Sequence, residues 1–447
     1  MKEVIKLKKD GSIEFETMKS HKNRLYFLCG FVCVVVLLVV FVVTRSHAKY
    51  RVTQSMPLVN GTINYSLPDL NIVGLYIDGE EATELDSSKT YILDTTQSTC
   101  TYKDGTEIAD LSISYDSETG NLTITPFTTK GTKCTLYFVE QLLVKDTLLA
   151  NYPTQLTRSD FSTVVTNTTT GTIYYADTSK GRTYYFAGNP TDNWVQFGGF
   201  YWRIIRINED GSIRMIYNGT STSTTGTGTQ IRTSAFNSGY NDNMYVGYMY
   251  QSGQVHGLNT SSTIKGILDT WYQNNLTGVT EKIDGNAGFC GDRTPSTSSS
   301  TSNGKGGTGM TQTYYAVYIR LDINNSPTFE CSDSSDLYTT SESINGNRAL
   351  IYPIGLITAD EIVYAGGVVR KANQNYYLYT DWMYWTMSPS YFDTNGHAYV
   401  FSMDYNGNPG SGGVNGGVPG VRPVINLRSD VTISSGNGTS ANPYVIN

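Results

Sequence analysis

An uninterrupted apolar segment near the N-terminus constrains this chain more than any other feature. It runs from Leu25 to Val43 and contains no charged residue. As a helix it would cover roughly 30 Å, the thickness of the hydrocarbon core of a bilayer. The segment therefore predicts a transmembrane helix over residues 25–43.

Basic residues flank this segment, with seven Lys or Arg before it and three soon after it. The excess of positive charge on the short N-terminal side predicts that residues 1–24 form a basic cytoplasmic tail. The chain is then a single-pass protein of the cell membrane, with its C-terminal region outside the cell. A cleaved signal peptide is the alternative, because Ser46-His47-Ala48 places small residues where such peptides are cut.

The composition of the remaining chain is typical of an extracellular β protein. Charged residues make up 16% of the whole sequence, whereas Tyr occupies 34 positions and Gly 44. Beyond residue 51 there are 22 basic and 35 acidic residues, a balance that argues against nucleic acid as a partner. With 39% hydrophobic residues, the chain has enough apolar material to form a folded core.

Four cysteines lie outside the apolar segment, and an even number is expected for disulfides in an oxidising compartment. The simplest pairing joins Cys100 to Cys134 and Cys290 to Cys331, because one pair then falls in each predicted domain. A metal site built from the four thiolates is the alternative, but no Cys-x-x-Cys spacing occurs. We expect two disulfides, no metal and no cofactor.

Short strands and turns fill residues 60–145. Apolar residues alternate over 111–115 and again over 134–138, and Asp116 to Gly120 supplies a hairpin loop between two of the strands. This pattern predicts a small β-sandwich of the immunoglobulin-like kind. We interpret it as a stalk that lifts the next domain away from the membrane.

A linker is expected over 146–171, followed by a second domain over 172–447. Within that domain the sequence predicts a hairpin from Phe200 to Tyr217 and a helix through Ile264–Trp271, where apolar residues recur at helical spacing. A capping box at Thr358-Ala359-Asp360-Glu361 predicts a second helix. Strands return near the C-terminus, so the fold class is mainly β with an α+β C-terminal domain.

Several motifs of this second domain resemble a family of uncharacterised surface proteins of low-GC Gram-positive bacteria. The resemblance covers nearly all of 172–447 and is specific as a set rather than motif by motif. The motifs are Trp202-Arg203-Ile204-Ile205-Arg206, Leu268-Asp269-Thr270-Trp271-Tyr272, Ile357-Thr358-Ala359-Asp360-Glu361, Trp385-Thr386-Met387-Ser388-Pro389 and Gly420-Val421-Arg422-Pro423-Val424-Ile425-Asn426-Leu427.

The resemblance implies a distant variant of the C-type-lectin-like fold shared with formylglycine-generating enzymes. Those enzymes use two cysteines near the end of the domain, whereas no cysteine follows Cys331 here. The Glu-Pro-Asn, Gln-Pro-Asp and Trp-Asn-Asp motifs of calcium-dependent lectins are also missing. The resemblance thus implies a fold rather than an oxidase or a calcium-dependent sugar site.

No catalytic constellation emerges from the sequence. Only His256 and His397 follow the leader, and they lie far apart, so we interpret both as surface or hydrogen-bonded loop residues. Asp360 and Glu361 are adjacent on a helix and should point in different directions, with Glu361 occupied by the capping box. Cys290 is expected in a disulfide rather than as a reactive thiol.

One segment, Asp404-Tyr405-Asn406-Gly407-Asn408, spaces oxygen ligands as calcium loops do. It lacks the distal bidentate Glu and falls where a hairpin turn is expected, and we favour the turn. Arg422 is expected to connect the last strand to a loop through charged hydrogen bonds.

Aromatic residues crowd the segment from 376 to 392 beside a glycine-rich loop. Aromatic rings with polar tips are typical of recognition surfaces for sugars and peptides. We expect Trp385 in the core, and we predict that the ligand-binding residues are Tyr379, Trp382, Tyr391 and Tyr405.

These features together predict a membrane-anchored bacterial surface protein whose C-terminal domain recognises a glycan or a protein. An extracellular enzyme on the same scaffold and a purely structural envelope protein are the alternatives.

Overall fold

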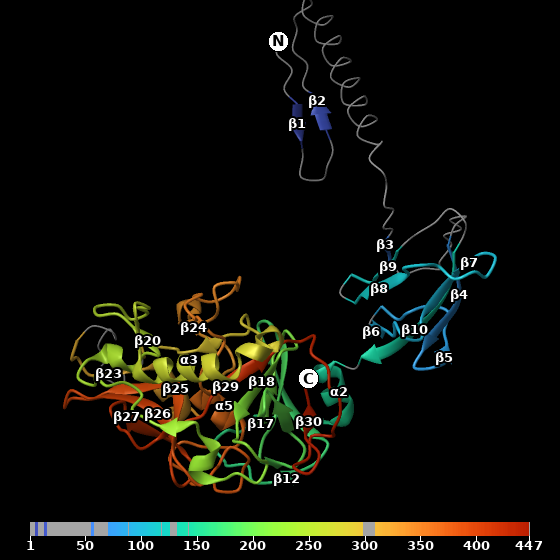
Figure 1. The fold of residues 1–447 in the computed structure, drawn as a ribbon. Coiled ribbons are helices and arrows are strands. Elements are labelled where there is room, and N and C mark those ends of the chain that lie inside the picture. The colour runs from blue at the N-terminus through green and yellow to red at the C-terminus, as the bar shows by residue number, and fades with distance from the viewer. Residues whose placement is uncertain are drawn as a thin grey trace, which may run out of the picture. The chain divides into compact units, whose positions relative to one another are not determined.

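The computed structural model describes residues 70–297 and 309–446, apart from 88, 118, 126–131 and 142, together with three short strands before residue 58. The chain divides into two compact units, Met1–Glu140 and Gln141–Asn447. Strands dominate both units (Figure 1). The mainly β class expected from the sequence is therefore confirmed.

Two sheets of the first unit share one hydrophobic core. Leu122 and Ile124 from the smaller sheet and Leu136 and Phe138 from the larger sheet are buried in this core. The smaller sheet has the order β3-β9-β8, and the larger sheet has the order β5-β4-β10-β6 with β7 also paired to β10. The strands are β3 (Ser55–Pro57), β4 (Leu70–Ile77), β5 (Glu80–Glu81), β6 (Thr90–Leu93), β7 (Thr99–Tyr102), β8 (Ser112–Asp116), β9 (Asn121–Thr125) and β10 (Thr132–Gln141), besides a separate pair β1 (Ile5–Leu7) and β2 (Ile13–Phe15).

An eight-stranded sheet forms one part of the second unit. Its main path is β11-β13-β14-β17-β16-β30, and β18 joins β17 to β29. The strands are β11 (Thr154–Leu156), β13 (Thr172–Thr178), β14 (Gly181–Tyr185), β16 (Trp194–Phe197), β17 (Phe200–Ile207), β18 (Ile213–Tyr217), β29 (Val424–Leu427) and β30 (Tyr444–Val445).

A six-stranded sheet forms the other part, with the order β19-β28-β25-β26-β27 and β23 paired to β25. Its strands are β19 (Arg232–Thr233), β23 (Thr313–Tyr314), β25 (Tyr384–Phe392), β26 (Ala398–Met403), β27 (Pro409–Gly413) and β28 (Gly420–Val421). Trp202 of β17 and Trp385 of β25 are both completely buried in the same core cluster, so the two sheets share one core. The placement of Trp385 in the core is confirmed.

Helices and short ladders connect the two sheets. The helices are α2 (Val144–Asn151), α3 (Thr263–Asn275), α4 (Ala316–Tyr318), α5 (Ala359–Tyr364), a π-helical turn η4 (Ile319–Ile323) and the 3-10 turns η1 (Gly226–Thr229), η2 (Asn243–Val246), η3 (Thr277–Lys282) and η5 (Ser334–Asp336). The ladders pair β12 (Thr168–Thr169) with β15 (Asn189–Pro190), β20 (Met249–Tyr250) with β21 (Thr260–Ser261), and β22 (Phe289–Cys290) with β24 (Leu337–Tyr338).

Local signals in the sequence predicted the main elements of this unit. The hairpin β17–β18 turns through Asn208 to Gly211, and Ser262 accepts a hydrogen bond from the Lys265 amide at the start of α3. The capping box of α5 is present, with Thr358 and Glu361 each bonding the other's backbone amide. These contacts satisfy backbone donors that a helix start leaves free.

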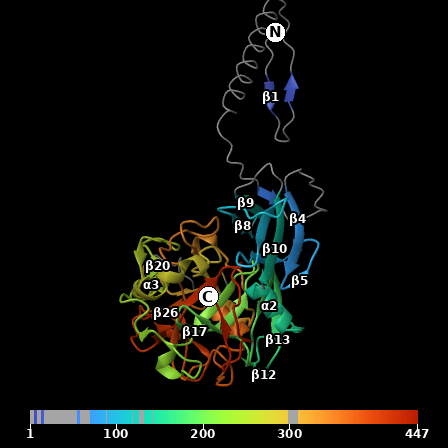
Figure 2. The same cartoon turned by 45° about the vertical axis from the view of Figure 1, so that its right-hand side comes forward.

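The segment 146–171 is not the linker that the sequence suggested. Val144, Leu148 and Tyr152 recur at four-residue spacing, and α2 buries them in the core of the second unit. Figure 2 shows α2 close to β13 of the same unit. Further along, β11 pairs with β13, and the Thr-rich end of the segment forms β12. The second unit therefore begins near residue 141 rather than at 172.

Among the residues that the structure describes, no helix is long and apolar enough to cross a membrane. The predicted transmembrane segment, residues 25–43, lies outside the described residues.

Candidate functional site

Three tyrosines on neighbouring strands form a row on one face of the six-stranded sheet. Tyr314 of β23 is opposite Tyr391 of β25, which is opposite Tyr399 of β26. Directly opposed residues share a sheet face, and the ring centroids lie 5.8 and 4.5 Å apart. Gly413 is opposite Tyr399 on β27, so no side chain continues the row there. All three rings are partly exposed.

A fourth tyrosine completes what we call the tyrosine cluster, defined as Tyr314, Tyr318, Tyr391 and Tyr399. The Tyr318 ring lies 5.0 Å from that of Tyr314 and 5.7 Å from that of Tyr391. Burial raises the pKa of Tyr391 to about 12 and that of Tyr318 to about 12. Both phenols are therefore protonated at neutral pH and can donate and accept hydrogen bonds.

Arg370 lies at the border of this cluster. Its Nη2 donates to the Tyr318 hydroxyl at 3.0 Å and pairs with Asp322 at 2.6 Å. The Arg370 side chain is 72% exposed, whereas that of Asp322 is buried. The border of the cluster thus presents an exposed guanidinium whose charge is paired with Asp322.

Three of the four predicted ligand residues, Tyr379, Trp382 and Tyr405, lie together outside the tyrosine cluster. The rings of Trp382 and Tyr405 meet edge to face at 5.4 Å, and Tyr405 is 46% exposed. Gln374 Nε2 donates to the Tyr379 hydroxyl at 3.1 Å and to the Tyr405 carbonyl at 3.3 Å. The Tyr379 hydroxyl donates to Asp381 at 2.9 Å.

Tyr391 is not part of that group. Trp382 lies before the first residue of β25, whereas Tyr391 is next to its last residue. At about 3.3 Å per residue, the part of the strand between them, from Tyr384 to Tyr391, spans roughly 23 Å. The four residues therefore do not form one surface, and their role in ligand binding stays a prediction. They belong to two surfaces, because the aromatic segment runs along a whole strand.

The carboxylate of Asp404 is engaged by its own turn. Its Oδ1 accepts from the amides of Asn406 at 2.7 Å and Asn408 at 3.2 Å, and its Oδ2 accepts from Asn408 Nδ2 at 2.7 Å. The described part of the chain contains no group of three or more His, Cys, Asp or Glu arranged to hold a metal ion. The oxygen spacing of this segment follows from the turn between β26 and β27.

A polar cavity of about 160 Å³ lies within the second unit. Two groups of buried or half-buried charged side chains line it, together with the Cys290–Cys331 disulfide and the loop that carries Lys180. The first group consists of Arg206, Glu209, Arg214 and Glu361, and the second of Asp292, Arg320 and Asp360. Sequence reasoning did not predict this site.

The first group is organised by Glu361. Its Oε1 lies 3.1 Å from Arg206 Nε and 2.6 Å from Arg214 Nε. Its Oε2 accepts the Thr358 amide at 2.9 Å. Burial acts to raise the pKa of Glu361, but Arg214 and Arg206 outweigh burial and hold this pKa below its ordinary value. Glu361 is therefore ionised and holds two strands to α5.

The second group is organised by Arg320 of η4. Its Nε and Nη2 donate to the two oxygens of Asp360 at 2.7 Å each, and its Nη1 pairs with Asp292. Asp360 also accepts the Thr328 amide at 3.0 Å. Asp360 and Glu361 thus both face one cavity, although adjacent helical residues were expected to diverge. Each carboxylate is already paired, which leaves neither free as a general base.

Asp292 differs from the other carboxylates of the cavity. Its side chain is 3% exposed, and its Oδ1 has no hydrogen-bond partner among the described residues. Its backbone has a φ of 31°, in a region that non-glycine residues seldom occupy. Burial raises the pKa of Asp292, and Arg320 offsets this only in part.

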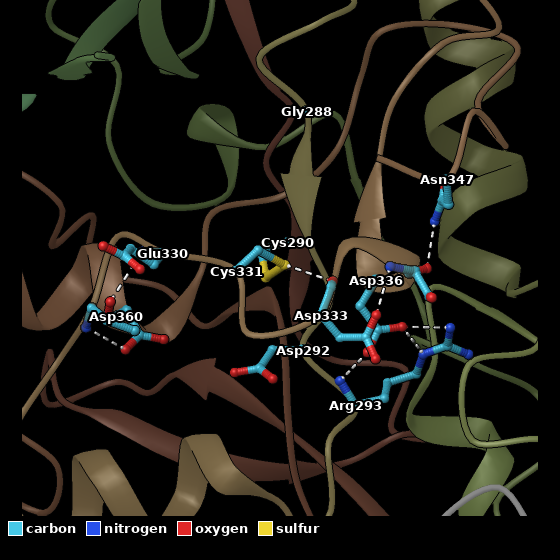
Figure 3. The surroundings of a disulfide bond; sticks show 12 residues. Gly288, Cys290, Asp292, Arg293, Glu330, Cys331, Asp333, Asp336, Asn347 and Asp360 are labelled. Carbon is cyan, nitrogen blue, oxygen red and sulfur yellow. Dashed lines mark hydrogen bonds and ion pairs between the residues drawn. A yellow bond between two sulfur atoms is a disulfide. The ribbon is translucent and has the colours of Figure 1, made fainter. Parts of the chain in front are cut away.

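Both predicted disulfides are confirmed, Cys100 with Cys134 and Cys290 with Cys331. Cys290 is therefore not a free thiol. Figure 3 shows the second disulfide together with Asp292, Glu330 and Asp360, all of which line the cavity.

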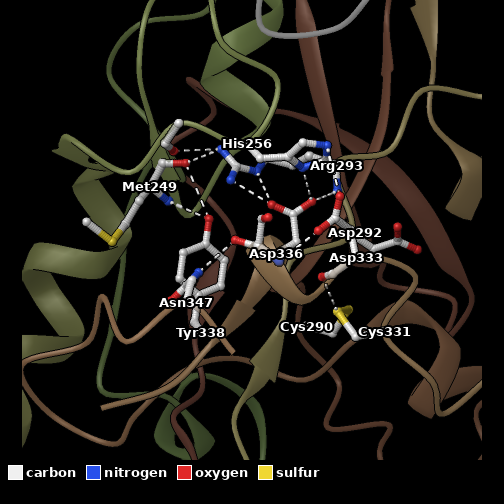
Figure 4. A network of polar contacts seen from close by, with 12 residues as sticks. Met249, His256, Cys290, Asp292, Arg293, Cys331, Asp333, Asp336, Tyr338 and Asn347 are labelled. Carbon is white, nitrogen blue, oxygen red and sulfur yellow. Dashed lines mark hydrogen bonds and ion pairs between the residues drawn. A yellow bond between two sulfur atoms is a disulfide. The ribbon is translucent and has the colours of Figure 1, made fainter. Parts of the chain in front are cut away.

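A separate network contains His256 (Figure 4). His256 Nδ1 lies 3.0 Å from Asp336, whose side chain is completely buried and accepts from Arg293 Nε at 2.8 Å. The hydrogen bond to Asp336 raises the pKa of His256. His397 stacks on Tyr240 at an exposed turn. Each His is a hydrogen-bonded or surface residue in the structure, and the two lie in different contacts.

The buried arginines were the signal that sequence reasoning missed. Arg206 and Arg214 lie within otherwise apolar strands of a chain that has few charges, and such a charge needs a buried partner. Arg422 was interpreted correctly: it is completely buried and donates to Tyr217 O and Leu378 O. Tyr314 and Tyr318 could not be joined to Tyr391 without the strand pairing.

The chain was compared with models of protein families, with curated proteins and with solved structures, and none of the three comparisons found a match.

Proposed function

We propose that this chain is a membrane-anchored bacterial surface protein whose second unit recognises a glycan. The apolar segment of residues 25–43 supplies the anchor, the first unit serves as an immunoglobulin-like stalk, and the second unit is a distant variant of the C-type-lectin-like fold. The observation that carries the recognition role is the row of Tyr314, Tyr391 and Tyr399 across three neighbouring strands.

The chemistry of this row suits a sugar better than an apolar partner. Rings of tyrosine provide apolar contact area, and their hydroxyls donate and accept hydrogen bonds. Arg370 adds an exposed guanidinium beside the row, and because Asp322 already pairs its charge, it contributes hydrogen-bond donors rather than an unmatched charge. The rigid strand pairing holds the rings in place before binding, which limits the entropy lost on association.

The test is binding of the oxidised full chain to an array of glycans and cell-wall fragments, with calcium and with a chelator. The double variant Tyr391→Ala/Tyr399→Ala should reduce binding at least tenfold. Tyr175→Ala/Tyr184→Ala is the matched control, because these two tyrosines form a cross-strand pair on the other sheet. Binding that persists in the first variant, or falls equally in the control, would contradict the proposal.

The pair Trp382→Ala/Tyr405→Ala distinguishes the second aromatic surface. If binding is lost only in this variant, recognition belongs to the Trp382 surface and the assignment to the tyrosine cluster is wrong. Melting temperatures of all variants should stay within a few degrees of the parent.

A further inference from the structure

Two residues that line the cavity of the second unit each carry a buried polar atom without a hydrogen-bond partner among the described residues. Asp292 Oδ1 accepts no hydrogen bond from the described residues, and Arg206 Nη1 donates none. The nearest carboxylate to Arg206 Nη1 in an ion pair is Glu209, at 3.7 Å, which is beyond hydrogen-bond distance. The two residues that carry this acceptor and this donor both line the cavity.

Leaving such atoms unmatched is unfavourable. A buried polar group without a partner destabilises a protein by about 1–3 kcal/mol, and more when the group is charged. The Asp292 side chain is 3% exposed, so bulk solvent does not solvate it freely. The backbone of Asp292 also has a positive φ. Strained backbone conformations of this kind are found mostly at functional sites, where the surrounding structure holds them in place.

The charges of the lining restrict the class of ligand. Lys180, Arg206, Arg214 and Arg320 are opposed by Glu209, Asp292, Glu330, Asp360 and Glu361, so neither sign dominates. A phosphate or a multivalent cation would leave half of these charges opposed to it. A molecule with one positive and one negative end matches the lining. The cavity volume of 160 Å³ greatly exceeds the roughly 10–15 Å³ needed for one water, so the cavity has room for a molecule larger than water.

We propose that this cavity binds a small zwitterion of the amino-acid class, with its ammonium group on Asp292 and its carboxylate on Arg206. The site is separate from the tyrosine cluster, and no residue of that cluster lines the cavity. The Cys290–Cys331 disulfide holds the cavity wall that carries Asp292. An ammonium group pairs with the carboxylate that Arg320 only half satisfies, and the guanidinium of Arg206 offers a charge-assisted donor to a carboxylate.

Calorimetric titration of the oxidised full chain with a panel of free L- and D-amino acids tests this proposal. Primary amines and carboxylic acids of matching size form the comparison arms. We expect saturable binding of at least one amino acid, and at least tenfold weaker binding of the amine or acid that lacks one end. Equal binding of a simple amine, or no binding by any amino acid, would overturn the proposal.

Variants separate binding from folding. Asp292→Asn keeps the shape of the side chain and removes its charge, and it should weaken binding at least tenfold. Asp177→Asn is the matched control, because Asp177 is an exposed carboxylate that also pairs with an arginine, Arg182. If Asp292→Asn lowers the melting temperature strongly, Ala287→Leu replaces it as the test.

Ala287 is a partly exposed residue of the cavity lining, so a larger side chain there narrows the cavity and leaves every ion pair in place. Binding should be lost in Ala287→Leu. Undiminished binding in both cavity variants would overturn the proposal.

Discussion

Two disulfides close loops of similar length in this chain, yet their surroundings differ. Cys100 and Cys134 lie directly opposite each other on β7 and β10, and both are buried in the apolar core of the first unit. Cys290 and Cys331 are partly exposed and line a cavity of charged side chains. The first crosslink supports a sheet, whereas the second fixes the wall of a polar site. Similar spacing in the sequence therefore does not imply a similar role.

The largest effect is expected from removal of the first disulfide. The sequence separations of 34 and 41 residues give each crosslink a chain-entropy contribution of about 4 kcal/mol. The double variant Cys100→Ala/Cys134→Ala loses this stabilisation in the first unit, which has the smaller hydrophobic core. We expect the first unit to unfold, and amide hydrogen exchange in β4 and β10 should accelerate by orders of magnitude. Unchanged exchange in these strands would show that the sheet does not depend on the crosslink.

Removal of the second disulfide should have a similar entropic effect on a much larger core. The double variant Cys290→Ala/Cys331→Ala should leave β17, β18 and β25 protected from exchange, because these strands are buried in that core. Exchange should accelerate around β22 and in the loop of Cys331. Global unfolding of the second unit in this variant would show that both units depend on their disulfides to the same extent, contrary to our expectation.

The substitution Glu361→Gln tests whether the charged surroundings of the second disulfide stabilise the unit. Loss of the carboxylate charge removes the ion pair of Arg214 and leaves Arg206 with only the longer pair to Glu209. Breaking a buried ion pair in this way is expected to destabilise by about 3 kcal/mol. Denaturant unfolding measures the change. Asp177→Asn, which breaks an exposed ion pair, should change the free energy of unfolding by less than about 1 kcal/mol.

The smallest effect concerns the His256 network, and its sign follows from the direction of the pKa shift. The pKa of His256 is higher in the folded protein, so its stabilising contribution is complete below pH 6.5 and is lost as pH rises through the folded pKa. For a partly exposed pair this contribution is about 0.5 kcal/mol. In His256→Gln, unfolding measured from pH 5 to 9 should lose this dependence. His397→Gln is the matched control, because His397 lies at an exposed turn. If the pH dependence of unfolding is lost in His397→Gln and kept in His256→Gln, its assignment to His256 is wrong.

Particular residues show how far prediction from sequence reached. The helical spacing of apolar residues from Ile264 to Trp271 located one helix, and the Thr358 capping box located the start of another, because both patterns depend on residues three or four positions apart. The glycine-rich segment before β28 was expected to be a loop, yet Pro409–Gly413 forms β27 against β26. Small side chains there allow the strand to lie against Trp385, which a Cβ at Gly412 would approach to 2.8 Å.

The sequence by itself determined the properties that depend on neighbouring residues and on composition. These are the mainly β class, the β17–β18 hairpin, the capped helices and the pairing of cysteines. The predicted membrane segment belongs to the same kind of inference and stays a prediction.

Only the tertiary structure decided which distant residues meet. Strand register placed Tyr314 and Tyr399 beside Tyr391, and it separated Tyr391 from Trp382. Packing of β17, β18, η4 and α5 brought the arginines and carboxylates of the cavity together. Such contacts depend on long-range pairing and on the burial of charge, which no local pattern in the sequence specifies.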